Sequence, residues 1–263
     1  MLSMIYRVYA YVFGRVLFAK LNKFLYQISL RGLGILNYQG DYLIGENAWL
    51  KKYLQGKKNP IILDVGAHVG NYSKTIFDID QESKILAFEP HPSTFKKLIT
   101  NVKSKNFEAF NVGVGSSAGA LELYDYDTKD GSQHASLYKD VIKTLHKGNP
   151  ISHLVEIITL DKLLSDKNII EIDLLKIDTE GNEYNVLLGV KSFLKKRKIK
   201  AIHLEFNEMN IISKSTFKDF WDLLLDYKFY RILPGGELLP IKNYIPLMTE
   251  IYAFQNIVAI LKI

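Results

Sequence analysis

From residue 60 onward, short apolar runs alternate with segments in which apolar residues recur at helical spacing. Runs of about four to eight apolar residues are typical of strands that are buried on both faces of a sheet. We expect strands at the segments PIILDVG, KILAFEP, EAFNVGVG, IDLLKID, IKAIHLEF, FYRILP and NIVAILKI. Helices are expected between them, at NYSKTIFDI, HPSTFKKLITNVK, EYNVLLGVKSFLKK and STFKDFWDLLLDY. This alternation predicts an α/β fold with a mostly parallel sheet that carries helices on both faces.

Residues 1–58 lie outside this alternation, and we expect them to form an N-terminal helical extension to a single α/β domain at residues 59–263. Aromatic and aliphatic residues dominate the first 30 positions, but basic residues interrupt them, so no run of about 20 apolar residues exists to span a bilayer. A signal peptide is not expected, because no short apolar core is followed by a small-residue cleavage site. Two interpretations stay open: amphipathic helices packed on the main domain, or helices lying on a membrane surface with their basic residues at the lipid head groups.

The composition of the chain excludes some kinds of catalytic chemistry and argues against some kinds of binding partner. The chain of 263 residues has no cysteine, which excludes disulfides, zinc–thiolate sites and thiol catalysis. This fits a reducing compartment, so we expect a cytoplasmic protein, with peripheral contact to a membrane surface as the alternative. The net charge of +6 would suit an anionic partner, but the basic residues are scattered apart from LKKRKIK at 194–200. We therefore expect no nucleic-acid partner, and the pattern carries no signal for an oligomeric state.

An insertion at residues 116–155 interrupts the alternation with glycines, serines, histidines and tyrosines. Its length exceeds that of an ordinary loop, and long insertions in compact domains are usually functional or disordered. It follows the third expected strand and therefore starts at the carboxyl edge of the sheet, where open α/β sheets bind ligands. We expect the insertion to lie close to a ligand site.

Acidic residues, asparagines and glycines gather where the expected strands end. They are Asp64, Gly66 and Gly70, then Glu89, then Asn111 and Gly113, then Asp178 and Glu180, and finally Glu205, Asn207 and Glu208. The carboxyl ends of parallel strands meet at one edge of a sheet, so we expect these side chains to lie together. Glycine permits a tight turn and a close approach by a ligand, and a carboxylate at Glu89 can accept both hydroxyls of a ribose. The arrangement predicts a cofactor that carries a nucleoside.

The spacing of the glycines separates two classes of cofactor. Dinucleotide-binding folds use G-x-G-x-x-G, in which the second glycine admits the pyrophosphate. Here the spacing is G-x-x-x-G, with Ala67 and His68 between the glycines, and Asp64 would repel a diphosphate. The same carboxylate suits an ammonium group. S-adenosylmethionine has one, together with a carboxylate and a sulfonium, and is therefore favoured over a nicotinamide cofactor.

Five blocks of sequence together resemble the FkbM family of S-adenosylmethionine-dependent methyltransferases. They are LDVGAHVGNYS, AFEPHPSTFKKLITN, NVGVGSSAGALELY, GSQHASL and EIITLDKLLSDKNIIEIDLLKIDTEGNEYNVLLGV, in order over roughly residues 60–208. The resemblance implies a Rossmann-like class I methyltransferase fold with a seven-stranded, mostly parallel sheet. It also implies O-methylation of a hydroxyl on a glycan, a glycolipid or a secondary metabolite, with the insertion at 116–155 near the acceptor.

The resemblance assigns cofactor-binding roles by position. The residues it implies are Asp64, Val65, Gly66, Ala67, His68, Gly70, Asn71, Glu89, Pro90, Asn111 and Asp178. Of these, Asp64, Gly66, Ala67 and Gly70 would hold the methionine end. Glu89 would hold the ribose with Pro90 shaping its turn, and Asn111 would lie near the adenine. His68 departs from the family, which usually has asparagine there, and Gly115 stands where serine is frequent.

Transfer to an alcohol needs a group that withdraws the hydroxyl proton. The candidates, in order, are Asp178, Glu180, Glu205 and His134. Each has another interpretation. Asp178 could anchor the cofactor ammonium, and Glu180 could be a first-turn acid of a helix capped by Thr179. Glu205 could end a strand in solvent, and His134 could be an ordinary loop residue.

Three further interpretations are kept. A divalent cation bridged by Asp178 and Glu205 is chemically reasonable but not favoured, since no spacing is diagnostic of a metal site. His203, on an apolar strand, is expected to be a core histidine with a satisfied partner. The alternatives to a methyltransferase are a nicotinamide-dependent oxidoreductase and a non-catalytic nucleoside-binding protein of the same fold.

Overall fold

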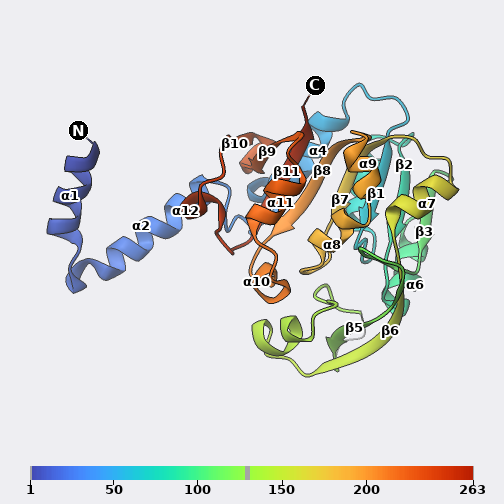
Figure 1. Ribbon diagram of the computed structural model, residues 1–263, viewed down its shortest axis with the longest axis horizontal. Coiled ribbons are helices and arrows are strands. Elements are labelled where there is room, and N and C mark those ends of the chain that lie inside the picture. The colour runs from blue at the N-terminus through green and yellow to red at the C-terminus, as the bar shows by residue number, and fades with distance from the viewer. Residues whose placement is uncertain (1, 128–130, 263) are drawn as a thin grey trace.

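The computed structural model describes residues 2–127 and 131–262, and its centre is an eight-stranded sheet (Figure 1). The strands stand in the order β10-β9-β11-β8-β7-β1-β2-β3, in which β8, β7, β1, β2 and β3 run parallel and β11 runs antiparallel to both of its neighbours. Their bounds are β1 Ile61–Val65, β2 Lys84–Phe88, β3 Phe107–Phe110, β7 Ile172–Ile177, β8 Ile199–Phe206, β9 Tyr227–Ile232, β10 Leu238–Ile241 and β11 Gln255–Leu261. The predicted α/β fold with a mostly parallel sheet is confirmed.

Two strands differ from the expectation. The seven expected strands are present, and β10 adds an eighth by pairing antiparallel with β9 at the edge of the sheet. The expected third strand divides, because the chain leaves the main sheet after Phe110 and forms β4 (Gly113–Val114) in a second sheet. At the break, the side-chain amide of Asn111 donates to the carbonyl oxygens of Glu89 and Pro90. That contact turns the chain away from β2.

Helices cover both faces of the sheet because alternate residues of each strand point to opposite sides. Leu63 of β1 packs with α7, α8, α9 and α11, whereas the preceding Ile62 packs with Trp49 of α4 and Ile76 of α5. The helices concerned are α4 Glu46–Leu54, α5 Asn71–Ile79, α6 Pro92–Asn101, α7 Leu160–Asp166, α8 Glu183–Leu188, α9 Lys191–Lys195 and α11 Phe217–Leu223. Shorter helices lie at α3 Asp41–Ile44, α10 Met209–Ser213 and α12 Pro246–Thr249, with a 3₁₀ turn at Pro234–Gly236.

The single helix expected over EYNVLLGVKSFLKK is two helices, α8 and α9. They separate at Gly189, whose backbone passes against the carbonyl oxygen of Gly115, where a Cβ would lie 2.1 Å from that oxygen. The break therefore depends on a contact with a distant segment. A helical period in the sequence cannot show such a contact.

The insertion at 116–155 is mostly an ordered second sheet. Its strands β5 (Gly119–Tyr126) and β6 (Pro150–Ile158) form an antiparallel hairpin, β4 pairs with β6, and a π-helical turn at Val141–Leu145 lies between the two long strands. In Figure 1 this sheet lies beside the ends of the main strands, below α8 and α10. Buried Asp125 accepts hydrogen bonds from the backbone N–H groups of Gly131 and Ser132 and so ties the loop after β5 to the sheet.

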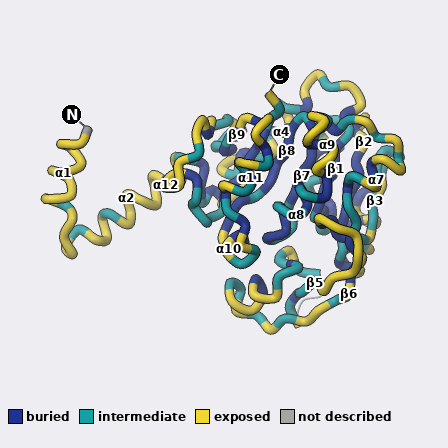
Figure 2. The backbone as a smooth tube through the Cα atoms, viewed as in Figure 1, coloured by how far each residue is buried: buried dark blue, intermediate teal, exposed yellow. Residues whose placement is uncertain are grey.

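The first two helices stand away from the rest of the molecule (Figures 1 and 2). They are α1 (Leu2–Phe13) and α2 (Ala19–Gly32), joined by a 3₁₀ turn at Val16–Phe18. Among the side chains described in this segment only Leu30 is buried, so the interpretation that these helices pack on the main domain is wrong. No helix in the described part of the chain is long and apolar enough to cross a membrane.

Candidate active site

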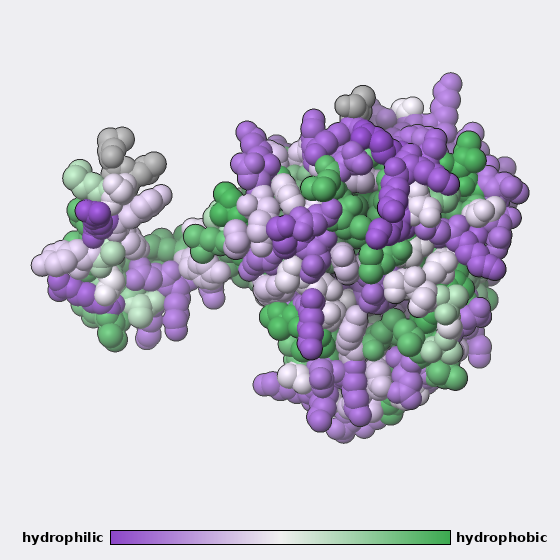
Figure 3. Space-filling model, in the orientation of Figure 1, coloured by the Kyte–Doolittle hydropathy of each residue, from purple (hydrophilic) through white to green (hydrophobic). Residues whose placement is uncertain are grey.

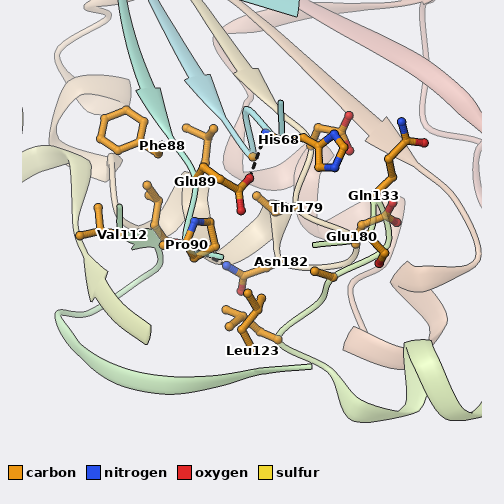
Figure 4. A pocket seen from close by; sticks show the side chains of 18 residues that line it. His68, Phe88, Glu89, Pro90, Val112, Leu123, Gln133, Thr179, Glu180 and Asn182 are labelled. Atoms are coloured by element: carbon orange, nitrogen blue, oxygen red, sulfur yellow. Dashed lines mark hydrogen bonds between the residues drawn. The ribbon is translucent and has the colours of Figure 1, made fainter. Parts of the chain in front are cut away.

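A cavity opens at the carboxyl ends of β1, β2 and β7, and we call it the Glu89 cavity (Figure 4). Strand β5 of the second sheet and the segment between β5 and β6 form its far wall, through Leu123, Gln133 and Leu137. The predicted site residues that line it are Val65, Gly66, His68, Glu89, Pro90, Asp178 and Glu180. These residues come from loops that are far apart in the chain but adjacent at the edge of the sheet.

Glu89 is held in the cavity by backbone groups. Its Oε2 accepts the N–H of His68 at 2.9 Å, and its Oε1 accepts the N–H of His91 at 2.8 Å. Burial raises the pKa of Glu89 to about 7, against the lowering effect of these two hydrogen bonds. Each carboxylate oxygen can accept a second hydrogen bond. The side chain is thus oriented to receive two neighbouring hydroxyls.

Gly66 makes the close approach that forms the cavity floor. It has φ +82°, and a Cβ on it would lie 1.7 Å from the carbonyl oxygen of Asp178. The loops after β1 and β7 therefore meet at a position that tolerates no side chain. Gly70, also left-handed at φ +88°, precedes α5 and packs against Leu98 and Val102 without lining a cavity.

The remaining wall of the Glu89 cavity is largely apolar. Its side chains include Phe88, Pro90, Val112, Val114, Leu123 and Leu137. A mostly apolar slot with a few fixed polar groups is typical of small-molecule sites. Asn111 does not line it, although its hydrogen bonds to the Glu89 and Pro90 carbonyls fix the turn that carries Glu89.

A larger cavity adjoins the first, and we call it the Lys176 cavity. The two share Gly66, His68, Gln133, Asp178 and Glu180 as lining residues. The predicted site residues on the Lys176 cavity are Asp64, Gly66, Ala67, His68, Asn71, His134, Asp178, Glu180 and Glu205. All four candidate bases therefore lie around one space, and of the predicted cofactor residues only Gly70 and Asn111 line neither cavity.

Lys176 is the residue that sequence reasoning missed. It is buried in β7 with its Nζ 3.4 Å from Oδ2 of Asp178 and 5.6 Å from the centre of the Tyr72 ring. Burial alone would lower the pKa of Lys176, but Asp178, Glu46 and Glu205 raise it above its usual range. The available signal was a lysine inside the apolar run IDLLKI, in a strand that is otherwise buried.

Acidic side chains dominate the Lys176 cavity. The described lining holds six carboxylates, which are Glu46, Asp64, Asp178, Glu180, Glu205 and Glu208, and one lysine. Burial raises the pKa of Asp64 to about 6, although its Oδ2 accepts a hydrogen bond of 2.6 Å from the Ser73 hydroxyl. A cleft lined by one sign of charge attracts ligands of the opposite sign. The Lys176 cavity favours a cationic group.

Glu180 sits in a strained loop, not in the first turn of a helix. Its φ is +53°, and α8 begins three residues later at Glu183, with Asn182 as the residue before it. The interpretation of Glu180 as a first-turn acid capped by Thr179 is therefore wrong. Glu183 holds the loop instead, because its Oε1 accepts the N–H groups of Thr179 and Gly181. Strained backbone of this kind concentrates at functional sites.

His134 lies beside Glu180. Its Nδ1 is 3.5 Å from Oε1 of Glu180, and its ring stacks on His146 with centroids 4.3 Å apart. Burial raises the pKa of Glu180 to about 7, against the lowering effect of His134. The second sheet thus brings a histidine to a carboxylate at the carboxyl edge of β7.

The structure also shows the environments of two other residues named from the sequence, Glu205 and His203. Glu205 is half-buried rather than a solvated strand end, and its burial raises its pKa well above the usual range. His203 is buried, with its Nε2 3.0 Å from Oδ1 of Asn256 and its Nδ1 3.3 Å from the Tyr72 hydroxyl. The prediction of a core histidine with satisfied partners is confirmed.

His68 has a left-handed backbone, with φ +47°. Asparagine, aspartate and histidine are the non-glycine residues that most often adopt this conformation. The asparagine usual in the resembled family and the histidine found here therefore meet the same backbone requirement. Among the residues described, no group of three or more histidines and carboxylates is arranged to hold a metal ion, so the geometry adds no support for a cation at Asp178 and Glu205.

Comparison with known proteins shows that the sequence is similar to methyltransferases. The sequence matches the methyltransferase FkbM domain over residues 64–231. Methyltransferase sdnD of Sordaria araneosa is 31% identical over 50% of this chain and 61% of its own length, and 2-O-methyltransferase NoeI of Sinorhizobium fredii is 24% identical over 68% and 77%. Among solved structures, a precorrin-6y C5,15-methyltransferase from Geobacter metallireducens aligns with TM-score 0.43 and 12% identity over 82% of this chain and 87% of that one.

The sdnD match and that to methyltransferase 1 of Beauveria bassiana each span about three fifths of the relative's length, at 61% and 57%. The FkbM domain match, by contrast, begins at Asp64 and ends at Arg231 in β9, and it includes all the residues that line the Glu89 cavity and most of those that line the Lys176 cavity. It therefore covers most of the sheet and more than half of the chain. The chain belongs to the FkbM family of methyltransferases.

Proposed function

We propose that the protein is an S-adenosylmethionine-dependent O-methyltransferase. The observation that carries the proposal is the fixed carboxylate of Glu89 in an apolar slot that opens into a carboxylate-rich cavity. A nucleoside that bears a cationic side chain matches both halves of this space. When bound, S-adenosylmethionine supplies a methyl group activated by a sulfonium.

Each part of the site has a role in holding the cofactor. Glu89 would accept the ribose hydroxyls, and the apolar wall with Pro90 would flank the adenine. The glycine loop between β1 and α5 would admit the methionine end, with Asp64 and Asp178 nearest its ammonium. Asp178, whose oxygen lies 3.4 Å from the Lys176 ammonium, is better suited to anchoring than to proton removal, since an ion pair weakens a base.

Glu180 is the better candidate for the base. It lines both cavities, and its pKa of about 7 lies near the optimum for a general base at neutral pH. His134 at 3.5 Å can share the proton that Glu180 takes from the acceptor hydroxyl. Burial raises the pKa of Glu205 well above its usual range, so Glu205 gives up a proton less readily than a solvated glutamate does.

The acceptor in this proposal is a hydroxyl of a glycan, a glycolipid or a secondary metabolite. The polar lining of the Lys176 cavity, with Asn207 and Tyr38 beside the carboxylates, supports a hydroxyl-rich ligand. The name of the relative NoeI states 2-O-methyl transfer. The cytoplasmic location expected from the absence of cysteine stays a prediction.

Calorimetry and methyl-transfer assays test the proposal together. Purified protein should bind S-adenosylmethionine and not NAD, and labelled methyl should pass to a member of a panel of glycans, lipid-linked sugars and polyhydroxylated metabolites. Glu89→Ala should weaken cofactor binding by about 100-fold, since hydrogen bonds to a charged group are lost. Glu82→Ala, on the exposed surface, is the control. Binding of NAD alone would indicate an oxidoreductase, and cofactor binding without transfer to any acceptor would indicate a non-catalytic protein.

A further inference from the structure

The segment α1–α2 exposes an unusual amount of apolar surface, and we call this segment the helical arm (residues 2–32). Of the 27 exposed large hydrophobic side chains among the described residues, 14 lie in the arm. Leu17 is 83% exposed, Tyr11 78% and Phe24 58%. Single exposed apolar residues are ordinary, but a concentration of this kind marks an interaction surface. Figure 3 shows the arm standing apart from the body, with green apolar patches among paler and purple side chains.

Helix α2 carries an exposed apolar stripe with basic side chains around it. Leu21, Phe24, Leu25 and Ile28 follow i, i+3, i+4, i+7 spacing and are all exposed. Lys20 and Arg31 flank that stripe, four residues before Phe24 and three residues after Ile28, and Lys23 lies on the opposite side of the helix. An amphipathic helix with basic residues beside an apolar face is typical of helices that lie in the interface of a membrane.

The charge of the arm has one sign only. Residues 1–40 contain Arg7, Arg15, Lys20, Lys23 and Arg31 and no aspartate or glutamate. Anionic lipid head groups attract such clusters at short range. Two arms packed against each other would bring like charges together, so a second copy of this chain fits the arm less well than an anionic surface does.

Contacts within the arm hold its two helices in a bent shape without help from the body. The Asn22 amide donates to the carbonyl of Phe13, and the Tyr9 hydroxyl donates to Oδ1 of Asn22. The ring of Phe13 packs on the rings of Tyr9 and Phe18, with centroids 4.9 and 5.1 Å apart. The surface is therefore formed before any partner arrives. With 12 residues, α1 is too short to span a bilayer.

We propose that the helical arm docks this protein on an anionic lipid surface, with the α2 stripe in the acyl boundary and the basic residues at the head groups. The arm joins the body through Ile35, which pairs with Gln255, and through Leu36, whose N–H donates to Phe254. Tyr38 and Phe254 line the Lys176 cavity. Docking therefore places one wall of that cavity beside the membrane.

Vesicle flotation with the full chain tests the docking. The protein should float with phosphatidylcholine vesicles that contain about 30% phosphatidylglycerol, and should bind pure phosphatidylcholine vesicles at least about 10-fold more weakly. Replacing Leu21, Phe24, Leu25 and Ile28 by serine should abolish flotation, and K20E/K23E should reduce it about 10-fold. Salt of about 0.5 M should weaken binding of the wild type.

The control variant carries Ile170→Ser and Leu225→Ser, two exposed apolar residues of the body, and should float like the wild type. Thermal unfolding and S-adenosylmethionine binding should be unchanged in every variant, because the altered residues lie outside the core and both cavities. Equal and weak flotation with both kinds of vesicle would overturn the proposal. So would a dimer in sedimentation velocity without lipid that becomes a monomer in the four-serine variant, since the occupant would then be a second copy.

Discussion

The Glu89 cavity and the Lys176 cavity share a wall but are built in different ways. In the first, backbone groups do the positioning: two N–H donors hold the carboxylate of Glu89, and a glycine lets two loops touch. In the Lys176 cavity, side chains determine the arrangement, because Lys176 lies among carboxylates contributed by segments from residue 46 to residue 208. The shape of the Glu89 cavity therefore depends on backbone contacts, and the electrostatics of the Lys176 cavity depend on side chains from distant segments.

Two acids with similar pKa values differ in what surrounds them. Glu89 and Glu180 both have a pKa of about 7, but Glu89 is held by two backbone donors and Glu180 faces the titratable His134. A proton on Glu89 would change binding of the cofactor. A proton on Glu180 would change turnover. Four predictions test the roles given to residues of the two cavities, from the largest expected effect to the smallest.

Glu180→Gln should lower turnover by about 100- to 10,000-fold, because the amide cannot accept the acceptor proton. Affinity for S-adenosylmethionine should stay within about 3-fold, a free-energy change below about 0.7 kcal/mol. The measurements are single-turnover methyl transfer and calorimetry. Glu208→Gln, an exposed acid on the same cavity, serves as the control. Full activity in Glu180→Gln would return the role of base to Asp178.

Gly66→Ala should destabilise the fold by about 3 kcal/mol and abolish cofactor binding. The new Cβ would lie 1.7 Å from the Asp178 carbonyl oxygen, at a φ of +82° that side chains rarely adopt. Denaturant unfolding measures the loss. Gly119→Ala, where a Cβ meets nothing within 4 Å, should leave stability nearly unchanged. Equal stability of the two variants would contradict the close contact between the loops.

The pH dependence of stability separates Glu89 from a solvated acid. Its folded pKa of about 7 exceeds the ordinary 4.5, so the folded state binds the proton more tightly than the unfolded state does. The stability this confers is full below pH 4.5 and is lost as the pH rises through about 7. The melting temperature of the cofactor-free protein should fall between about pH 5 and 8, and less steeply in Glu89→Gln than in Glu82→Gln. Identical slopes in the two variants would refute the buried carboxyl.

His68→Asn should change stability by less than about 0.5 kcal/mol, because asparagine adopts the left-handed backbone readily. His68→Val should cost about 1–2 kcal/mol, since a β-branched residue does not adopt it. Thermal unfolding of both variants measures the difference. A large loss in His68→Asn would show that the imidazole itself, rather than the backbone, matters to the Glu89 cavity.

Much of the Glu89 cavity was predictable because its features are local. Gly66 and Glu89 each stand directly after a strand, and a parallel sheet brings such positions to one edge. Asn111 was assigned to the adenine by resemblance, and that assignment stays a prediction. The structure adds that its side-chain amide donates to the carbonyl of Glu89, a contact that spacing along the chain cannot show.

The Lys176 cavity was only partly predictable. The sequence placed its four candidate bases at the carboxyl edge of the sheet, as the structure does. In the sequence, however, Lys176 is only one residue of a strand, and the four carboxylates around it become apparent only in the structure. Glu46 lies outside the alternating region altogether, on α4, and its contribution depends on how that helix packs on Ile62. Spacing along the chain carries no information on such contacts.

The sequence by itself determined the order of strands and helices, the glycine turn after β1 and the acid after β2. These features depend on the spacing of apolar residues and on local backbone conformation, and both act over only a few residues. Only the tertiary structure decided that Lys176 is neutralised by carboxylates, that Glu180 meets His134, and that the helical arm leaves the body with its apolar side chains exposed. Those outcomes depend on burial and on charges far apart in the chain, and both exist only once the layers have packed.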